Sequence, residues 1–383
     1  MQPATLLPLL LLLVAAVAPR FAVSSRPSPA AEAAVTETLD VTASLSRARA
    51  AISTDAISLL HQSAAKEPVR TRSRRSRRKK KAGLTVRLHS RDFLPGEHGR
   101  HESYRSLVLS RLARDSARAA AVAYGDGSYT VGDFATETLT LGDSPPVANV
   151  AIGCGHDNEG LFVGAAGLLA LGGGPLSFPS QISASTFSYC LVDRDSPAAS
   201  TLQFGDGAGA DTDAVTAPLL RSPRTNTFYY VGLAGISVGG QALSIPTSAF
   251  AMDASGTGGV IVDSGTAVTR LQASAYSALR DAFVRGTPSL TRASGVSLFD
   301  TCYDLSDRTS VEVPAVALRF EGGGTLRLPA KNYLIPVDGA GTYCLAFAPT
   351  NAAVSIIGNV QQQGTRVTFD TAKGTVGFAA NKC

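Results

Sequence analysis

From Val122 to its end, the chain is a succession of short apolar or alternating segments interrupted by Gly, Pro, Asp and Asn. Examples are FATETLTLG from Phe134, YYVGLAGISVGG from Tyr229 and VALRFEGGGTLRLP from Val316. Segments of this length and spacing form strands joined by turns, because helices need longer stretches with a 3.6-residue period. The pattern therefore predicts an all-β body of roughly 260 residues.

Within this body, the segment RVTFDTAKGTVGFAA from Arg366 predicts a hairpin with its turn at Ala372 to Gly374. Residues 273–285 predict one helix.

Before the body, residues 84–88 predict a strand, and residues 102–121 have the apolar spacing of a helix. Residues 26–68 are rich in Ala, Ser and Thr, and we expect them to be flexible or weakly helical.

The N-terminal stretch Leu6 to Ala18 contains 13 apolar residues. This is too short to span a bilayer and suits the core of a signal peptide, with small residues at Ala22 and Ser24 for cleavage. The alternative is that this apolar stretch forms a buried helix of the folded protein. We expect residues 1–24 to be a signal peptide and the protein to be secreted to the extracellular space (apoplast) or the vacuole, without a membrane anchor after signal removal.

The formal net charge of +5 is concentrated in residues 70–81, RTRSRRSRRKKK, which hold nine basic residues. Without them the remainder has a formal charge of −4. A charge run of this kind is usually solvated, and we interpret it as part of a propeptide-like region, residues 25–121, where trypsin-like enzymes could cut. The sequence has no basic patch interleaved with aromatic residues, so we do not expect a nucleic-acid partner.

Five cysteines lie in the β body, an odd number that leaves at least one thiol without an internal partner. Their spacing does not define the pairing and includes no C-x-x-C metal motif. We expect neither a metal nor another cofactor.

The sequence contains one G-x-S-x-G, from Gly235 to Gly239. A nucleophile elbow turns from a strand into a helix and needs a later histidine, yet hairpin residues follow Ser237 and all five histidines precede it. We therefore expect Ser237 to be an ordinary strand residue.

The segment VIVDSGT, Val260 to Thr266, places a carboxylate at the end of an apolar strand. The apolar run would anchor the loop, Gly265 would let the backbone approach the carboxylate, and the Ser264 and Thr266 hydroxyls could hold it in position. Alone this is weak evidence, because Asp-Ser-Gly is also common in turns.

Two further segments strengthen the interpretation, SIIGNV from Ser355 and the hairpin-like VAYGDGSYTVGDFATETLTLG from Val122. Together the three resemble the pepsin-like aspartic proteases, and more closely their plant nepenthesin-type branch. Features similar to that branch are GCGHDNEGLF from Gly153, LGGGPLSFPSQ from Leu171, FSYCLVDRD from Phe187, FYYVGLAGISVGG from Phe228 and the terminal Lys382-Cys383. The resemblance covers residues 122–383, and residues 84–119 resemble the end of the family's propeptide.

The resemblance implies a bilobal fold with an N-terminal lobe in 122–225 and a C-terminal lobe in 226–383. It implies that Asp263 is the second catalytic aspartate within the active-site loop and that Ile356-Ile357-Gly358 packs beside this loop. The implied substrate flap is Tyr124, Gly125 and Asp126. The implied disulfides are Cys302–Cys344 and Cys190–Cys383, which leave Cys154 unpaired.

The sequence departs from the family pattern, which has one Asp-Thr/Ser-Gly in each lobe. Asp263 begins the single such motif of this sequence. The propeptide-like helix runs directly into the flap near Ala119 to Val122, so the segment that separates them in the family is absent. The intervening segment would carry the first motif and the partner of Cys154. In addition, Ala170 replaces the glycine of the first lobe's apolar-apolar-Gly motif. We therefore expect a truncated N-terminal lobe with uncovered sheet edges and apolar faces.

Hydrolysis in this family uses two facing carboxyls that share a proton, one acting as base and the other as acid. With one of the two, the chain is expected to be a weak or inactive endopeptidase whose partner is a polypeptide substrate or peptide ligand, in a monomer. One alternative is a dyad built from two chains, as in retroviral proteases. A second is a binding or inhibitor protein similar to the plant xylanase inhibitors, and a third is a splice form or incomplete gene sequence.

Overall fold

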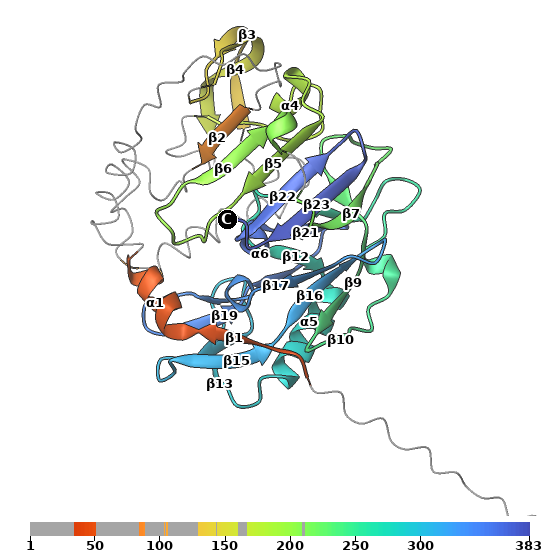
Figure 1. Cartoon of the computed structure of the whole chain (residues 1–383). Helices are drawn as coiled ribbons and strands as arrows, with labels where there is room; N and C mark the ends of the chain where they lie inside the picture. The colour runs from red at the N-terminus through yellow and green to blue at the C-terminus, as the bar shows by residue number, and fades with distance from the viewer. Residues whose placement is uncertain are drawn as a thin grey trace, which may run out of the picture. The chain divides into compact units, whose positions relative to one another are not determined.

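The computed structural model describes residues 34–50, 84–88, 103, 105, 129–142, 144–159, 167–208 and 211–383 (Figure 1). These residues belong to one compact unit, Ala34–Cys383. The signal peptide, the basic run 70–81 and the flap residues Tyr124, Gly125 and Asp126 lie outside the described residues, as does the helix expected at 102–121 apart from Ser103 and Arg105.

The central feature of the unit is a sheet of 11 strands, which confirms the all-β expectation. Its order is β2 (Leu84–Leu88), β6 (Ser200–Phe204), β5 (Thr186–Cys190), β22 (Thr365–Asp370), β23 (Thr375–Ala380), β7 (Val215–Leu220), β8 (Tyr230–Val231), β11 (Val260–Val262), β21 (Ser355–Ile357), β12 (Thr269–Gln272) and β20 (Phe347–Thr350). The sheet joins the two expected lobes through backbone hydrogen bonds, because β5 of the first pairs with β22 of the second.

Two four-stranded sheets lie within residues 226–383, the expected second lobe. One has the order β10 (Gln241–Ala242), β9 (Leu233–Val238), β16 (Val316–Phe320) and β17 (Thr325–Leu328). The other has the order β13 (Thr291–Ala293), β14 (Cys302–Asp304), β19 (Thr342–Leu345) and β18 (Leu334–Pro336).

Two strand pairs and several short helices make up the remaining regular structure of the described residues. The pairs are β1 (Thr36–Asp40) with β15 (Ser310–Pro314), and β3 (Tyr129–Leu139) with β4 (Val147–Glu159). The α-helices are α1 (Val41–Ala50), α4 (Phe178–Gln181), α5 (Ala273–Arg285) and α6 (Asn359–Gln362), and the 3-10 turns are η2 (Gly205–Ala208), η3 (Thr247–Ala249) and η4 (Ala330–Asn332).

Three of the elements expected from local patterns lie where they were predicted. Strand β2, helix α5 and the β22–β23 hairpin have the predicted positions, and Gly374 has the positive φ of +66° that the hairpin turn requires. Ser237 lies in β9, and Gly239 and Gly240 then turn the chain back into β10. Ser237 is thus the strand residue that was expected.

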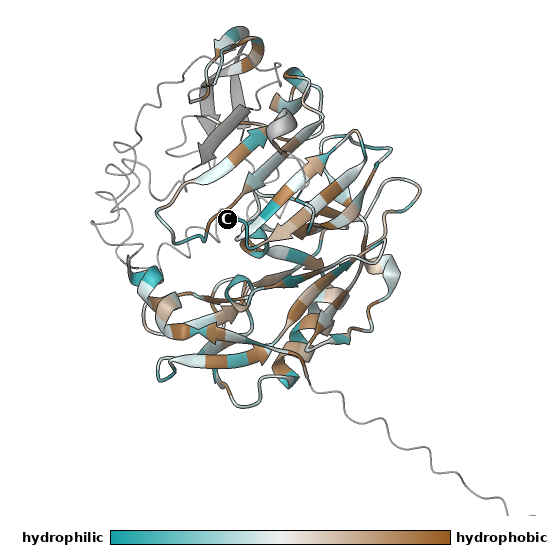
Figure 2. Ribbon diagram, viewed as in Figure 1, coloured by the Kyte–Doolittle hydropathy of each residue, from teal (hydrophilic) through white to brown (hydrophobic). Residues whose placement is uncertain are grey.

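Alternating burial explains why the strands pack as they do. In β15, Val311 and Val313 are buried whereas Glu312 is exposed, and the corresponding change of colour along the strands is visible in Figure 2. Stacked rings of Phe187 and Phe369, 4.8 Å apart, pack β5 against β22 in the core.

Both disulfides implied by the family resemblance are present. Cys302–Cys344 joins β14 to β19, and Cys190–Cys383 joins β5 to the last residue. Cys154 lies in β4, but its side chain is outside what the structure describes, so its lack of a partner stays a prediction.

The segment expected to be flexible or weakly helical, 26–68, is in part well structured. Helix α1 agrees with the helical tendency, but strand β1 was not expected. Its pairing with β15 supplies the hydrogen bonds that a five-residue strand cannot make by itself.

The described part of the expected first lobe, within residues 122–225, exposes apolar residues. Leu168 and Leu176 are 59% and 61% exposed, and within the described ranges β3 and β4 pair with each other and with no third strand. Apolar side chains and strand edges of this kind are surfaces that other segments can cover, and the truncation of this lobe stays a prediction. Nowhere in the described ranges is a helix both long and apolar enough to cross a membrane.

Candidate active site

The Asp263 loop begins where β11 ends. Val260, Ile261 and Val262 are buried, and β11 pairs in parallel with β21 on one side and antiparallel with β8 on the other. The backbone N–H of Asp263 then donates to the carbonyl of Ile357 at 3.1 Å. A buried strand held from both sides therefore fixes where the carboxyl leaves the sheet.

The carboxyl of Asp263 is oriented by its own loop. The backbone N–H of Gly265 donates to Oδ1 at 2.8 Å, and the hydroxyl of Thr266 donates to Oδ2 at 2.6 Å. Thr266 is buried, whereas Asp263 and Ser264 are half-buried and Gly265 is exposed. The loop thus presents a held carboxyl at a partly open surface, as a catalytic or ligand-binding acid requires.

The SIIGNV segment locks this loop from the side. The side-chain amide of Asn359 donates to the carbonyl of Ser264 at 3.0 Å, and its backbone N–H donates to the carbonyl of Thr266 at 2.7 Å. The N–H of Val360 donates to the carbonyl of Ala267 at 2.9 Å. The predicted packing of Ile356-Ile357-Gly358 beside the active-site loop is therefore seen in the strand pairing and in these bonds.

Gly358 is required by close backbone contact. A Cβ at this position would lie 2.4 Å from the carbonyl carbon of Val268 and 2.8 Å from the amide nitrogen of Thr269. Because φ at Gly358 is −81°, the requirement is lack of space and not a left-handed backbone.

A buried amide network below the loop was not anticipated from the sequence. Gln361 Oε1 accepts from both the backbone N–H and the hydroxyl of Thr269, each at 2.8 Å. Its Nε2 donates to the carbonyls of Asn332 and Ala346, also at 2.8 Å. The sequence signal for this network was the run of three glutamines directly after the SIIGNV motif. Next to a buried strand, such amides must find hydrogen-bond partners inside the protein.

Tyr189 was also not singled out from the sequence. It lies on β5, and its hydroxyl donates to Oε1 of Gln362, whose Nε2 donates to the carbonyl of Ile357 at 2.8 Å. Burial, with a smaller effect from the negative charge of Asp263, raises the pKa of Tyr189 well above its ordinary value. Tyr189 is thus connected through Gln362 to the carbonyl of Ile357, which also accepts the backbone N–H of Asp263.

Of the predicted site residues, the structure brings together Asp263, Ser264, Gly265 and Thr266 with Ile356, Ile357 and Gly358. The flap residues named above fall outside the described residues. In the described ranges, no three His, Cys, Asp or Glu side chains gather in a way that could hold a metal ion.

A mostly β, sheet-linked body with an Asp-Ser-Gly loop locked by an apolar-apolar-Gly segment defines a pepsin-like aspartic-protease fold. Solved structures with this fold include the protein called edgp, with a TM-score of 0.56, 21% identity and coverage of 66% of this chain and 70% of that one. Basic 7S globulin from soybean gives a TM-score of 0.52 at 23% identity, covering 61% of this chain and 64% of the globulin.

The sequence comparisons identify the family. Residues 106–206 match the family described as Xylanase inhibitor N-terminal, and residues 228–380 match Xylanase inhibitor C-terminal. ASPARTIC PROTEASE IN GUARD CELL 2 of Arabidopsis thaliana is 54% identical over 265 residues, and aspartic proteinase nepenthesin-2 of Nepenthes gracilis is 42% identical over 265 residues. The chain belongs to the nepenthesin-like plant aspartic proteases of the A1 family.

The match covers part of the relatives only. It takes in 68% of this chain, but 56% of the guard-cell protein and 60% of nepenthesin-2. The chain therefore spans little more than half the length of these relatives.

We predict that Gly358→Ala destabilises the Asp263 loop, because its methyl group would overlap the backbone of Val268. Overpacking of this kind costs about 1–3 kcal/mol or more in free energy of unfolding, measurable by urea denaturation. Gly235→Ala is the matched control, since the atom nearest to its Cβ is at 3.7 Å on a flexible arginine. Equal stability losses in the two variants would contradict the packing argument.

We predict that Tyr189 contributes to unfolding by alkali. Its pKa is raised in the folded protein, so its contribution to stability is complete below pH ~10 and declines above this, where only the unfolded state loses the proton. Between pH 10 and 11, the free energy of unfolding should therefore fall more steeply in the wild type than in Tyr189→Phe. The expected difference in slope is up to about 1.4 kcal/mol per pH unit. Parallel curves from urea denaturation at pH 8, 10 and 11 would show that Tyr189 ionises freely when folded.

Proposed function

We propose that this chain is an aspartic-endopeptidase family member that binds polypeptide beside Asp263 and, in this form, hydrolyses peptide bonds weakly or not at all. The observation that carries the proposal is the Asp263 loop, in which both carboxyl oxygens accept hydrogen bonds from their own loop and the loop is locked by Asn359. The chain thus supplies the hydrogen bonds that orient one carboxyl and that hold its loop in place.

The chemistry explains why one carboxyl is not enough. An ionised carboxyl must take a proton from the attacking water while a protonated one stabilises the developing oxyanion. Two facing carboxyls divide these roles because close like charges cannot both ionise. Asp263 begins the single Asp-Ser/Thr-Gly of the sequence, so it can orient a water but has no partner motif in the same chain.

A second candidate function is that of a non-catalytic binding or inhibitor protein. The observation in its favour is that both matching family descriptions are of xylanase-inhibitor halves. In this case, the surface around Asp263 would bind a protein ligand without cutting it. The ligand in either case is a polypeptide, and the proposed state is a monomer that needs no cofactor and binds no nucleic acid.

We predict that the purified chain releases little or no peptide from denatured protein at acid pH, and that Asp263→Asn and pepstatin abolish any cleavage that is found. Asp307→Asn serves as control, because the Asp307 side chain is 74% exposed and lies outside the Asp263 loop. Acid-soluble peptide release measures the activity. Cleavage that survives Asp263→Asn would exclude Asp263 as the acting group.

The same assay separates the alternatives. Cleavage whose specific rate rises with protein concentration would indicate a dyad assembled from two chains. Cleavage as fast as that of an intact relative, from a monomer, would overturn the proposal of impaired hydrolysis.

We also propose that residues 1–24 direct secretion, on the basis of the apolar run Leu6 to Ala18. Leu12→Arg should retain the protein inside the producing plant cells, whereas Ser28→Arg, outside the apolar run, should not. N-terminal sequencing of the exported protein should find the start near residues 23–25. An exported chain that still begins at Met1 would contradict the cleavage.

A further inference from the structure

Residues 34–50, which we call the strap, add a strand and a helix to the second lobe. Strand β1 pairs antiparallel with β15 along all five of its residues, from Thr36 opposite Pro314 to Asp40 opposite Ser310. The pairing extends beyond β1, because the N–H of Val35 donates to the carbonyl of Gly239 at 3.0 Å and the N–H of Ala315 donates to the carbonyl of Val35 at 2.9 Å. The strap therefore covers the edge of β15 with a continuous hydrogen-bonded ladder.

The strap buries one side in the lobe. Leu39, Val41, Leu45 and Ala48 are all buried, with exposed fractions of 0–9%. Ala48 belongs to a small apolar cluster that also contains Val268, which follows the Asp263 loop, and Val360 of the SIIGNV segment. The strap helix thus shares an apolar cluster with residues that adjoin the candidate site.

Polar contacts fix the strap in one register. The side chain of Arg327 forms an ion pair with Glu37 at 2.7 Å, and the hydroxyl of Tyr343 donates to the carbonyl of Val41 at 3.1 Å. At the far end of the helix, Arg49 donates to the carbonyl of Gly339 from two nitrogens, at 3.1 and 3.3 Å. Contacts at the beginning, middle and end of the strap define a site for this segment.

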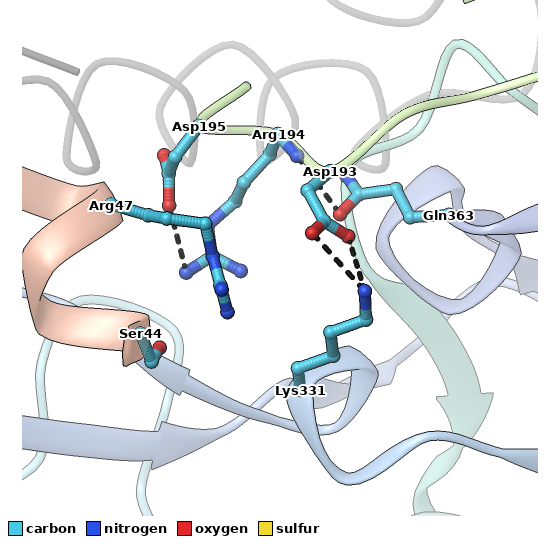
Figure 3. A pocket seen from close by; sticks show the side chains of 7 residues that line it. All are labelled: Ser44, Arg47, Asp193, Arg194, Asp195, Lys331 and Gln363. Atoms are coloured by element: carbon cyan, nitrogen blue, oxygen red, sulfur yellow. Dashed lines mark hydrogen bonds and ion pairs between the residues drawn. The ribbon is translucent and has the colours of Figure 1, made fainter. Parts of the chain in front are cut away.

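The strap helix also forms one wall of a polar pocket (Figure 3). Ser44 and Arg47 of α1 line it together with Asp193, Arg194 and Asp195, which follow β5, and with Lys331 and Gln363. An ion pair between Lys331 and Asp193 at 2.9 Å closes the opposite wall. The strap is therefore in reach of first-lobe residues as well as of the second lobe.

We propose that the second lobe is a permanent docking site for the strap, so that residues 34–50 stay bound as a separate chain when the connection at 51–83 is cut. The basic run 70–81 lies in that connection and is the natural place for such a cut. The partner that the surface fits is an extended strand followed by an amphipathic helix, supplied by the chain itself. The inference holds whether the body is a protease or a binding protein.

The test uses the full-length chain with a tobacco-etch-virus protease recognition sequence in place of residues 56–62. After cutting under native conditions, the N-terminal fragment should co-elute with the body in gel filtration at micromolar concentration, and should separate from it in denaturant. Separate elution of the fragment under native conditions would overturn the proposal.

A matched pair of helix variants tests the interface. Ala48→Asp places a charge in the buried cluster and should raise the dissociation constant of the cut fragment on the order of a hundredfold or more. Ser46→Asp makes the same substitution at an exposed position of the same helix and should leave the fragment bound. Equal retention in both variants would contradict the contact with the cluster, and the cut wild-type chain decides the proposal if Ala48→Asp does not fold.

Discussion

The parallel pairing of β11 with β21 is the constraint on which the candidate site depends. It brings the end of VIVDSGT beside SIIGNV, two segments that are far apart in the sequence. Their close approach is possible because position 358 has no side chain, and it allows the Asn359 amide and the Val360 N–H to bond to the carbonyls of the Asp263 loop. Backbone packing and side-chain hydrogen bonding thus hold the same carboxyl.

The residues that hold the Asp263 loop in position are different from the group that would share a proton with Asp263 in catalysis. Asp263 is oriented by Gly265 and Thr266, and the loop rests on Thr269 and the buried Gln361. None of these contacts comes from a second carboxyl. The contacts that orient the Asp263 carboxyl are therefore independent of any carboxyl that would share a proton with it.

Local sequence patterns predicted the parts of the fold that local forces determine. Strand β2, helix α5, the final hairpin and the strand character of Ser237 all depend on periodicity and turn residues within short windows. Asp263 and its loop were found because the motif is compact. Tyr189 and Gln361 were missed because their partners lie 173 and 92 residues away in the sequence, which no local pattern records.

The same reason explains why β1 was missed. The segment TETLD has no strong alternation, and β15 lies on a distant part of the chain. The disulfides were implied by family resemblance, since spacing alone leaves many pairings open.

The distance between β1 and β15 has a consequence for synthesis. Thr38 and Glu312, whose side chains are hydrogen-bonded, are 274 residues apart in the sequence. At about 5–20 residues per second, the ribosome needs on the order of 15–55 s to make the second after the first. During this interval β15 is not there to cover Leu39 and Val41, so a segment that is made early is among the last to be packed.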